Sequence, residues 1–506
     1  MSEELARYNA AEDLLGRNLG PGRADRTAVI DRDGHHTYAD IAAAANRFAN
    51  LLVRLGIHQE ARILLALEDS AAFHACFLGA IKAGVVPVPV NTLLTADDYA
   101  FIAADCRARL VVASPVQAER MQSIATRLPA FVDRGRAVAF TPLRDALAAE
   151  SPHADTADTR RDEPAFWLYT SGTTGRPKGA IHAHGDLAAT ADTYGAGVLG
   201  IGADDVVFSA AKLFFAYGLG NSLTFPFSVG ATAVLLDGAP APAAVRDIID
   251  RHRPTLFFGV PTLYAMLLNT GAVPAPGHRL RLALSAGEAL PATLLDRWRA
   301  EVGTDILDGI GSTEMLHIYI SNRPGDVRAG TSGTPVAGYE VEIRDDVGRV
   351  VPQGEIGDLY VKGPSMALGY WNRRATTAAT FRGEWMRTGD KYRVDDGRYV
   401  YCGRGDDLLK VGGIYVSPME VEDALLRHPG VAEAAVVGAR DGDDLVKPKA
   451  FVVPATGHAP SPALEETLIE HVRETLAPYK RPRWVEFVPS LPKTATGKIQ
   501  RYKLRQ

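Results

Sequence analysis

Short hydrophobic runs alternate with helical patterns through the first 260 residues of the chain. The helical patterns, with apolar residues three and four apart, are clearest at residues 37–56 and 71–84, and each ends at a glycine. Buried strands are predicted for the apolar runs at residues 62–68, 85–90, 109–114, 165–172, 205–211, 231–237 and 255–260. Alternation of this kind predicts layered α/β subdomains with largely parallel sheets.

From about Gly330 the pattern changes to strands bounded by glycine turns. Residues 339–345, 358–363 and 397–403 predict a small antiparallel β-barrel beside the α/β layers. The fold class is therefore α/β, with a large body of layered subdomains plus this small barrel.

A compact α+β module is predicted after residue 405. Its first helix is expected to begin after Ser417 as N-cap, with Pro418 at the first helical position and Glu420 closing a capping box. A strand at 431–438, a helix at 463–476 and a strand at 484–489 follow. We expect residues 1–405 to form the N-terminal domain and residues 406–506 the small C-terminal domain.

Composition indicates a folded protein with more than one domain. Of its 506 residues, 46% are hydrophobic and 23% charged, which excludes disordered and collagen-like classes. The length exceeds what one hydrophobic core usually spans. Cys76, Cys106 and Cys402 are far apart and form no CxxC pair, so neither a disulfide framework nor a thiolate metal site is expected.

The charge is unevenly distributed along the chain. The net charge is −5, yet residues 471–506 hold nine Lys or Arg against Glu474 and Glu486. These basic residues lie within the predicted C-terminal module, so we do not expect them to form a nucleic-acid arm.

Neither a signal peptide nor a membrane span is predicted. The N-terminus has a mixed-charge helical pattern without an apolar core. Residues 213–236 carry no charge and are long enough to cross a bilayer, but Asn221, Pro226 and three glycines interrupt the apolar run. A buried helix followed by a buried strand is the better interpretation. We expect a cytoplasmic protein with no membrane partner.

The segment that points most strongly to a binding site is LYTSGTTGRPKGAIHAH, residues 168–184. A strand that runs into a loop of threonine, serine and glycine exposes backbone N–H groups and hydroxyls, and Lys178 adds a positive charge. Together these groups suit a polyphosphate. The spacing does not fit the Walker pattern GxxxxGK[ST], so this is a different class of phosphate loop.

Six motifs follow one another along the chain: the loop at 171–179, SAGEAL at 285–290, DGIGSTEM at 308–315, RTGD at 387–390, GRGDDLLKVGG at 403–413 and PKTATGKIQR at 492–501. In this order they resemble the adenylate-forming superfamily of acyl-CoA synthetases, nonribosomal peptide adenylation domains and firefly luciferase. The resemblance covers essentially the whole chain. The segments KLFFAYGLGNSLTFP and DGIGSTEMLHIYIS are most similar to the benzoate-CoA ligase group.

The resemblance implies an ATP site. Thr313 matches the residue that contacts the α-phosphate and Glu314 the residue that holds Mg²⁺, since an acid beside a polyphosphate needs a bridging cation. Asp390 is expected to accept the ribose hydroxyls, with Arg404 nearby. The expected nucleotide-binding residues are Thr170, Ser171, Gly172, Thr173, Thr174, Lys178, Gly287, Glu288, Ala289, Asp308, Gly309, Ile310, Gly311, Ser312, Thr313, Asp390 and Arg404. Ile310 departs from the pattern of many relatives, which carry an aromatic residue stacked on adenine there.

Lys498 is the expected catalytic cation, together with Thr313 and Glu314. Attack of a carboxylate on the α-phosphate passes through an anionic transition state, which a positioned ammonium group stabilises. Members of the superfamily rotate the C-terminal domain between adenylation and thioesterification, which implies a mobile lid. Asp406 matches the hinge, and Gly412 and Gly413 match the surface that faces CoA.

The resemblance also implies a pocket for the acid. Its expected residues are Phe214, Ala216, Tyr217, Gly218, Gly287, Gly309, Ile310 and His317. Small residues are expected to leave a flat slot in which Tyr217 and Ile310 sandwich a planar ring. His317 either hydrogen-bonds a ring substituent or packs as a structural histidine, and the sequence leaves both open.

The predicted function is that of an aryl-CoA ligase. An aromatic carboxylate and ATP give aryl-AMP and pyrophosphate, and the thiol of CoA then displaces AMP. ATP, Mg²⁺ and CoA are the expected cofactors and co-substrates, and the chain is expected to act as a monomer or homodimer.

Three alternatives stay open at this point. The first is a medium-chain or alicyclic acyl-CoA synthetase. The second is a stand-alone adenylation enzyme that loads a carrier protein, with no fused carrier domain expected because the chain ends eight residues after Lys498. The third, a nucleotide-binding pseudoenzyme, is disfavoured by the presence of Thr313, Glu314, Asp390 and Lys498.

Overall fold

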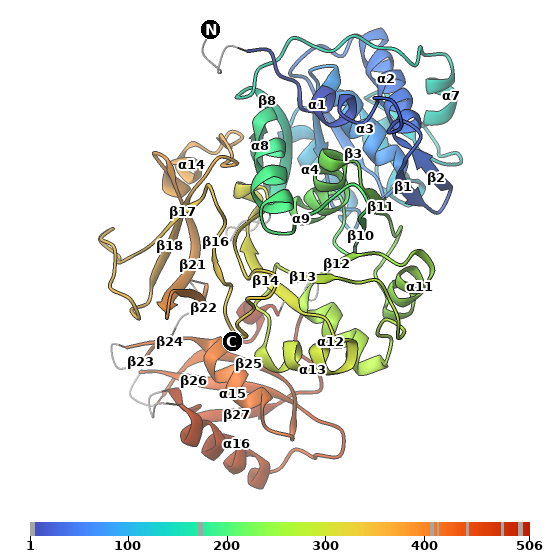
Figure 1. Ribbon diagram of the computed structural model, residues 1–506. Helices are drawn as coiled ribbons and strands as arrows, with labels where there is room; N and C mark the ends of the chain where they lie inside the picture. Colours follow the sequence, from blue (N-terminus) through green and yellow to red (C-terminus); the bar gives the residue numbers. More distant parts are fainter. Residues whose placement is uncertain are drawn as a thin grey trace.

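The computed structural model describes residues 6–170, 176–404, 409–411, 414–441, 445–476, 480–493 and 499–505. Figure 1 shows an N-terminal body of α/β layers, an antiparallel sheet beside it, and a C-terminal module at the bottom of the view. This mixed α/β architecture confirms the predicted fold class.

The largest sheet has nine strands in the order β16-β15-β14-β13-β12-β10-β11-β1-β2. The pairs from β14 to β1 are parallel, and β2, β15 and β16 are antiparallel to their neighbours. Its strands are β1 Thr27–Asp31, β2 Gly34–Thr37, β10 Val206–Ser209, β11 Thr232–Val234, β12 Leu256–Gly259, β13 Leu282–Ser285, β14 Ile306–Gly311, β15 Ile318–Ser321 and β16 Thr334–Pro335.

A second parallel sheet has the order β4-β3-β5-β6-β7, and a three-stranded antiparallel sheet has the order β19-β9-β8. The apolar runs of the sequence supply the buried strands here as predicted, because side chains covered on both faces are hydrophobic throughout. The strands are β3 Arg62–Ala66, β4 Val86–Pro89, β5 Val111–Ala113, β6 Ala130–Val132, β7 Thr141–Pro142, β8 Pro164–Thr170, β9 Lys178–Ala183 and β19 Gly369–Tyr370.

Helices cover the sheets, and the two helices predicted most clearly are confirmed as α2 and α3. A capping box between Thr37 and Asp40 begins α2, and Gly56 follows its end with a positive φ. The helices of the body are α1 Ala10–Gly16, α2 Tyr38–Arg54, α3 Ala71–Lys82, α4 Ala96–Asp105, α5 Pro115–Arg120, α6 Gln122–Ala125, α7 Leu143–Ala148, α8 His184–Thr190, α9 Ala216–Leu219, α10 Phe225–Val229, α11 Pro242–His252, α12 Pro261–Thr270, α13 Ala292–Val302 and α14 Arg374–Thr380, with the short helices η2 Ala191–Ala196, η3 Gly220–Thr224 and η4 Thr313–Met315.

The predicted barrel is half a barrel. Its sheet has the order β17-β18-β21-β20, with β22 also paired to β21, and no pairing among the described strands joins β17 to β22. The strands are β17 Glu340–Arg344, β18 Gly357–Lys362, β20 Phe381–Arg382, β21 Trp385–Asp395 and β22 Arg398–Arg404.

The described strands of the C-terminal module form two sheets, one of two strands and one of three, and the module has its own hydrophobic core, which includes Val421, Leu425, Val436 and Leu468. Its elements are β23 Leu409–Val411, β24 Ile414–Val416, α15 Pro418–Leu426, β25 Val431–Arg440, β26 Val446–Pro454, α16 Pro462–Thr475, β27 Trp484–Phe487 and η6 Arg501–Lys503. The boundary between residues 405 and 406 lies outside the described residues and stays a prediction.

The capping box predicted at α15 is wrong. Ser417 is the N-cap residue, but its side chain makes no cap hydrogen bond. The Glu420 carboxylate instead pairs with Lys480 Nζ at 2.6 Å. A lysine from a distant segment therefore takes the carboxylate that the local pattern assigned to the backbone.

Candidate active site

The β8–β9 hairpin positions Lys178 beside the predicted phosphate loop. Thr170 at the end of β8 pairs with Lys178 at the start of β9, so the two strands hold both ends of the loop. Ser171, Gly172, Thr173 and Thr174 lie outside the described residues.

The acidic motif turns sharply after β14. Ser312 caps η4 by accepting a hydrogen bond from Met315 N at 3.2 Å. Leu316 then has a φ of +63°, which is unusual for a residue other than glycine. The chain reverses here and returns as β15, which pairs antiparallel with β14. This turn presents Thr313 and Glu314 at the end of the large sheet.

Lys178, Glu314 and Tyr370 form a compact polar cluster, although they come from three distant segments. Lys178 Nζ lies 3.9 Å from Glu314 Oε1 and 3.9 Å from the centre of the Tyr370 ring. The Tyr370 hydroxyl donates to the same Glu314 oxygen at 2.6 Å. The structure therefore brings together the phosphate-loop lysine and the acid that were predicted separately.

The electrostatics of this cluster follow from burial. Burial lowers the pKa of the Lys178 amino group, the Glu314 carboxylate opposes that shift and the Arg404 guanidinium adds to it. Burial and the neighbouring Glu314 carboxylate raise the pKa of the Tyr370 hydroxyl. The hydroxyl therefore stays protonated and donates a hydrogen bond to Glu314.

Asp390 and Arg404 lie opposite each other on β21 and β22. Arg404 Nη1 approaches Asp390 Oδ1 at 3.5 Å. Because Arg404 also acts electrostatically on Lys178 and Tyr370, this pair belongs to the same polar region as the cluster. The two motifs that carry Asp390 and Arg404 thus converge on it.

The carboxyl ends of β13 and β14 supply the residues predicted to surround adenine. Ser285 pairs with Asp308, which places Gly287–Ala289 and Gly309–Ile310 together at the carboxyl ends of these two strands. Burial raises the pKa of the Asp308 carboxyl well above its usual range. Thr262 Oγ1 donates to Glu288 Oε2 at 2.9 Å. Ligands of open α/β sheets commonly bind at such carboxyl ends.

His317 lies among aromatic rings in the predicted acid pocket. Its ring centre is 5.1 Å from that of Tyr194, 5.4 Å from Tyr217 and 4.6 Å from Phe225. Nε2 lies 3.1 Å from Asn221 Oδ1, and burial lowers the pKa of the imidazole to about 3. His317 is therefore neutral near pH 7, and its buried Nδ1 has no hydrogen-bond partner among the described residues, so a structural role and a hydrogen bond to a ring substituent both stay predictions.

The neighbouring pocket residues are mostly small or buried. Phe214 is buried just before α9, and Ala216 and Gly218 are buried within it. A Cβ at Gly218 would lie 2.1 Å from Lys212 O, and one at Gly309 would lie 2.9 Å from Ile320 O. Close backbone packing requires these two glycines, so their missing side chains do not by themselves leave the expected slot.

Several predicted residues lie outside the described residues: Ser171, Gly172, Thr173, Thr174, Asp406, Gly412, Gly413 and Lys498. Sequence reasoning missed Tyr370, which lies in a two-residue strand without a recognisable pattern. It also missed His182, whose Nε2 lies 2.8 Å from the Thr313 carbonyl oxygen, and Asp186, whose Oδ2 lies 2.7 Å from His182 Nδ1. The only sequence signal of this pair is the spacing of four residues.

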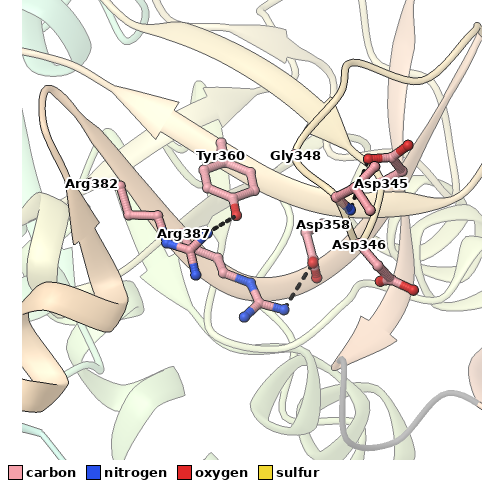
Figure 2. Close-up of a pocket in the computed structure, with 8 residues that line it drawn as sticks. Asp345, Asp346, Gly348, Asp358, Tyr360, Arg382 and Arg387 are labelled. Atoms are coloured by element: carbon pink, nitrogen blue, oxygen red, sulfur yellow. Dashed lines mark hydrogen bonds and ion pairs between the residues drawn. The ribbon is translucent and has the colours of Figure 1, made fainter.

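A separate cavity of about 260 Å³ opens on the half-barrel sheet (Figure 2), and none of the predicted site residues lines it. Arg387 of the RTGD motif pairs there with Asp358 at 2.8 Å, and Arg382 donates to the Tyr360 hydroxyl at 3.3 Å. The arginine of that motif therefore stabilises the sheet, while Asp390 of the same motif contacts Arg404.

None of the helices among the described residues combines the length and the apolar character that a membrane span needs. The same part of the chain holds no group of three or more His, Cys, Asp or Glu side chains placed to bind a metal ion.

The fold and the polar cluster define a nucleotide-binding enzyme of the adenylate-forming class. Residues 20–371 match the AMP-binding enzyme family, and residues 420–498 match the AMP-binding enzyme C-terminal domain. The chain belongs to the AMP-binding enzyme family.

Its relatives include enzymes named for aromatic acids. The chain is 54% identical to a benzoate–CoA ligase of Thauera aromatica, over 99% of this chain and 96% of that protein. It is 48% identical to a 4-hydroxybenzoate–CoA/benzoate–CoA ligase of Rhodopseudomonas palustris, over 99% and 94%. Among solved structures, a benzoate CoA ligase from Burkholderia xenovorans has a TM-score of 0.92 at 50% identity, covering 99% of this chain and 100% of that one.

Proposed function

We propose that the protein is an aryl-CoA ligase that joins an aromatic carboxylate to CoA through an aryl-AMP intermediate. The relatives confirm the predicted class, an AMP-forming acid–thiol ligase of the benzoate-CoA ligase type. Within the molecule, the observation that carries the proposal is the cluster of Lys178, Glu314 and Tyr370. A cation and an acid held side by side suit ATP phosphates and their counterion, and this chemistry supports the proposal.

In the first step, the substrate carboxylate attacks the α-phosphorus of ATP and pyrophosphate leaves. Lys178 and the loop from Thr170 hold the phosphates, and Thr313 contacts the α-phosphate. Asp390 accepts the ribose hydroxyls, with Arg404 beside it. The residues at 287–289 and 308–312 surround the adenine and the α-phosphate, with apolar packing from Ile310 in place of aromatic stacking.

The site fits Mg²⁺ through Glu314. Tyr370 and Lys178 both approach Oε1, and within the described part of the chain Oε2 makes no hydrogen bond or ion pair. Mg²⁺ in nucleotide enzymes is usually held by one or two carboxylates and by substrate phosphates, so a single acid suffices. The ion would neutralise charge on the phosphates when it is bound.

Lys498 remains our candidate for the catalytic cation of adenylation. We assign it to a C-terminal lid of residues 406–506 that turns about Asp406 against a body of residues 1–405. In the second step the CoA thiol attacks the acyl carbon of aryl-AMP, AMP leaves, and Gly412 and Gly413 face the CoA arm. A cytoplasmic location and a monomeric or homodimeric state stay predictions, which cell fractionation and light scattering test.

We expect the region around Tyr217 and His317 to favour an aromatic acid over a long aliphatic one. The rings of Tyr217 and His317 lie 5.4 Å apart, and Phe258 packs on Tyr217 at 6.1 Å, so flat groups line this region. Aromatic rings prefer such offset or edge-on neighbours.

The test is a CoA-ligation screen with benzoate, hydroxybenzoates, aminobenzoates, cyclohexanecarboxylate and hexanoate. We expect the highest kcat/KM with a benzoate. A preference for hexanoate or cyclohexanecarboxylate would favour the aliphatic or alicyclic alternative, and transfer to a phosphopantetheine carrier protein with no turnover of free CoA would favour the carrier-loading alternative.

A further inference from the structure

The three successive carbonyl groups of η4 (Thr313–Met315) are each held from outside the turn. His182 Nε2 lies 2.8 Å from the first carbonyl oxygen, the Ala367 amide donates to the second at 2.8 Å, and Ser365 Oγ donates to the third at 2.7 Å. Leu316, which follows, has the unfavourable φ of +63°. The turn that carries Glu314 therefore depends on distant donors for its shape.

His182 has contacts at both ring nitrogens. Nδ1 lies 2.7 Å from Asp186 Oδ2, which also accepts the Ala183 N–H at 3.1 Å. The His182 side chain is fully buried and stacks on Phe166 at 5.2 Å. Because the Thr313 carbonyl can only accept, Nε2 carries a proton and donates it. The Asp186 contact fixes the ring in the orientation that this bond needs.

The position of His182 on β9 connects the strand that carries Lys178 with the turn that carries Glu314. Lys178 and His182 are four residues apart on one strand, so their side chains project from the same face. Lys178 reaches Glu314 directly, and His182 reaches the carbonyl of the preceding residue. One rigid strand thus sets both the cation and the turn that presents the acid.

We propose that His182, oriented by Asp186, is a positioning residue that holds the Thr313 carbonyl and thereby places the Thr313 hydroxyl and the Glu314 carboxylate for adenylation. This inference rests on the proposed function, because it assigns His182 to the same adenylation site. His182 touches neither substrate nor ion in this role and acts through η4.

Two amide variants separate its two contacts. In His182→Gln the amide nitrogen reaches the place of Nε2 and keeps the Thr313 contact, whereas in His182→Asn it reaches the place of Nδ1 and keeps only the Asp186 contact. A misplacement of about 1 Å at reacting groups can cost about 100-fold in rate. We expect His182→Asn to lower kcat for benzoate-dependent pyrophosphate release by about 10–100-fold, with the KM for benzoate little changed.

His182→Gln is expected to recover most of that loss. Hydrogen exchange of the peptide covering residues 312–318 supplies a second readout, and we expect faster exchange in the Asn variant than in the Gln variant. His184→Asn is the matched control, because buried His184 accepts from Ala10 N at 3.2 Å and, among the described residues, makes no hydrogen bond to η4. This control is expected to keep the wild-type kcat.

The outcomes distinguish a failure of the positioning role of His182 from a failure of the proposed function. A wild-type kcat in His182→Asn, an equal loss in the Asn and Gln variants, or the same loss in His184→Asn would overturn the positioning role. If the wild-type protein releases no pyrophosphate with any aromatic acid, the proposed function fails instead. The exchange comparison of the Asn and Gln variants then still decides whether His182 holds η4.

Discussion

Removing the Tyr370 hydroxyl tests the electrostatic arrangement around Glu314. The hydroxyl donates to Glu314 Oε1 at 2.6 Å, and Tyr370 is only 6% exposed, so water screens this charge-assisted bond little. A hydrogen bond to a charged group contributes about 1.5–3 kcal/mol. Because about 1.4 kcal/mol corresponds to a tenfold change in rate, we expect Tyr370→Phe to lower kcat/KM for ATP by about 10–100-fold.

A second substitution separates the contribution of the Tyr370 hydroxyl from that of its aromatic ring. Phenylalanine keeps an aromatic face below Lys178 Nζ, which lies 3.9 Å from the ring centre, whereas leucine removes it. A partly desolvated cation–π contact is worth about 0.5–2 kcal/mol, so Tyr370→Leu is expected to lose a further factor of about 2–30. Tyr99→Phe is the matched control, because its hydroxyl donates at 2.9 Å to the Asn91 carbonyl, away from the cluster.

The assay is the initial rate of benzoate-dependent pyrophosphate release over a range of ATP concentrations. Circular dichroism and thermal unfolding check that each variant is folded. We expect Tyr99→Phe to match the wild-type rate. A folded Tyr370→Phe variant with the wild-type kcat/KM would refute the argument that this hydroxyl positions the Glu314 carboxylate.

Two further substitutions test the acid pocket and the stability of the body. A Cβ at Gly220 would lie 2.3 Å from His317 Cδ2. We therefore expect Gly220→Ala to raise the KM for benzoate by about tenfold and to leave the KM for ATP unchanged, measured by steady-state kinetics. Equal changes in both KM values would contradict a pocket role for His317. Burial raises the pKa of the Asp31 carboxyl, but hydrogen bonds from His36 and the Ala71 N–H outweigh it and hold this pKa at about 2. The carboxylate therefore stabilises the fold above the unfolded pKa of about 3.9, and this contribution is lost as the pH falls toward 2. Asp31→Asn is therefore expected to cost about 2 kcal/mol in urea unfolding at pH 7 and about half of that at pH 3, and an equal cost at both would contradict the linkage.

Local sequence patterns predicted the helices and strands of the body because buried positions are occupied by hydrophobic residues. The strands at Leu256–Gly259 and Val111–Ala113 are fully buried, so their residues are apolar throughout. The helix Tyr38–Arg54 begins at a capping box and is followed by a glycine, both of which act within a few residues. Such features need no knowledge of distant contacts.

The features that sequence reasoning missed all depend on contacts between distant segments. Glu420 was assigned to a capping box by its neighbours, yet Lys480, sixty residues away, takes its carboxylate. Tyr370 is one aromatic residue among many until folding brings its hydroxyl to Glu314, fifty-six residues away. The motifs predicted Lys178 and Glu314, but only the fold shows that a single strand positions both.

We propose that the protein activates an aromatic acid as its adenylate before CoA enters. The most direct test is to incubate the protein with benzoate, ATP and Mg²⁺ without CoA, quench the mixture, and detect the nucleotide products by mass spectrometry. We expect enzyme-bound benzoyl-AMP and pyrophosphate, and conversion to benzoyl-CoA and AMP when CoA is added. ADP and benzoyl phosphate as products, or the absence of benzoyl-AMP, would contradict the account.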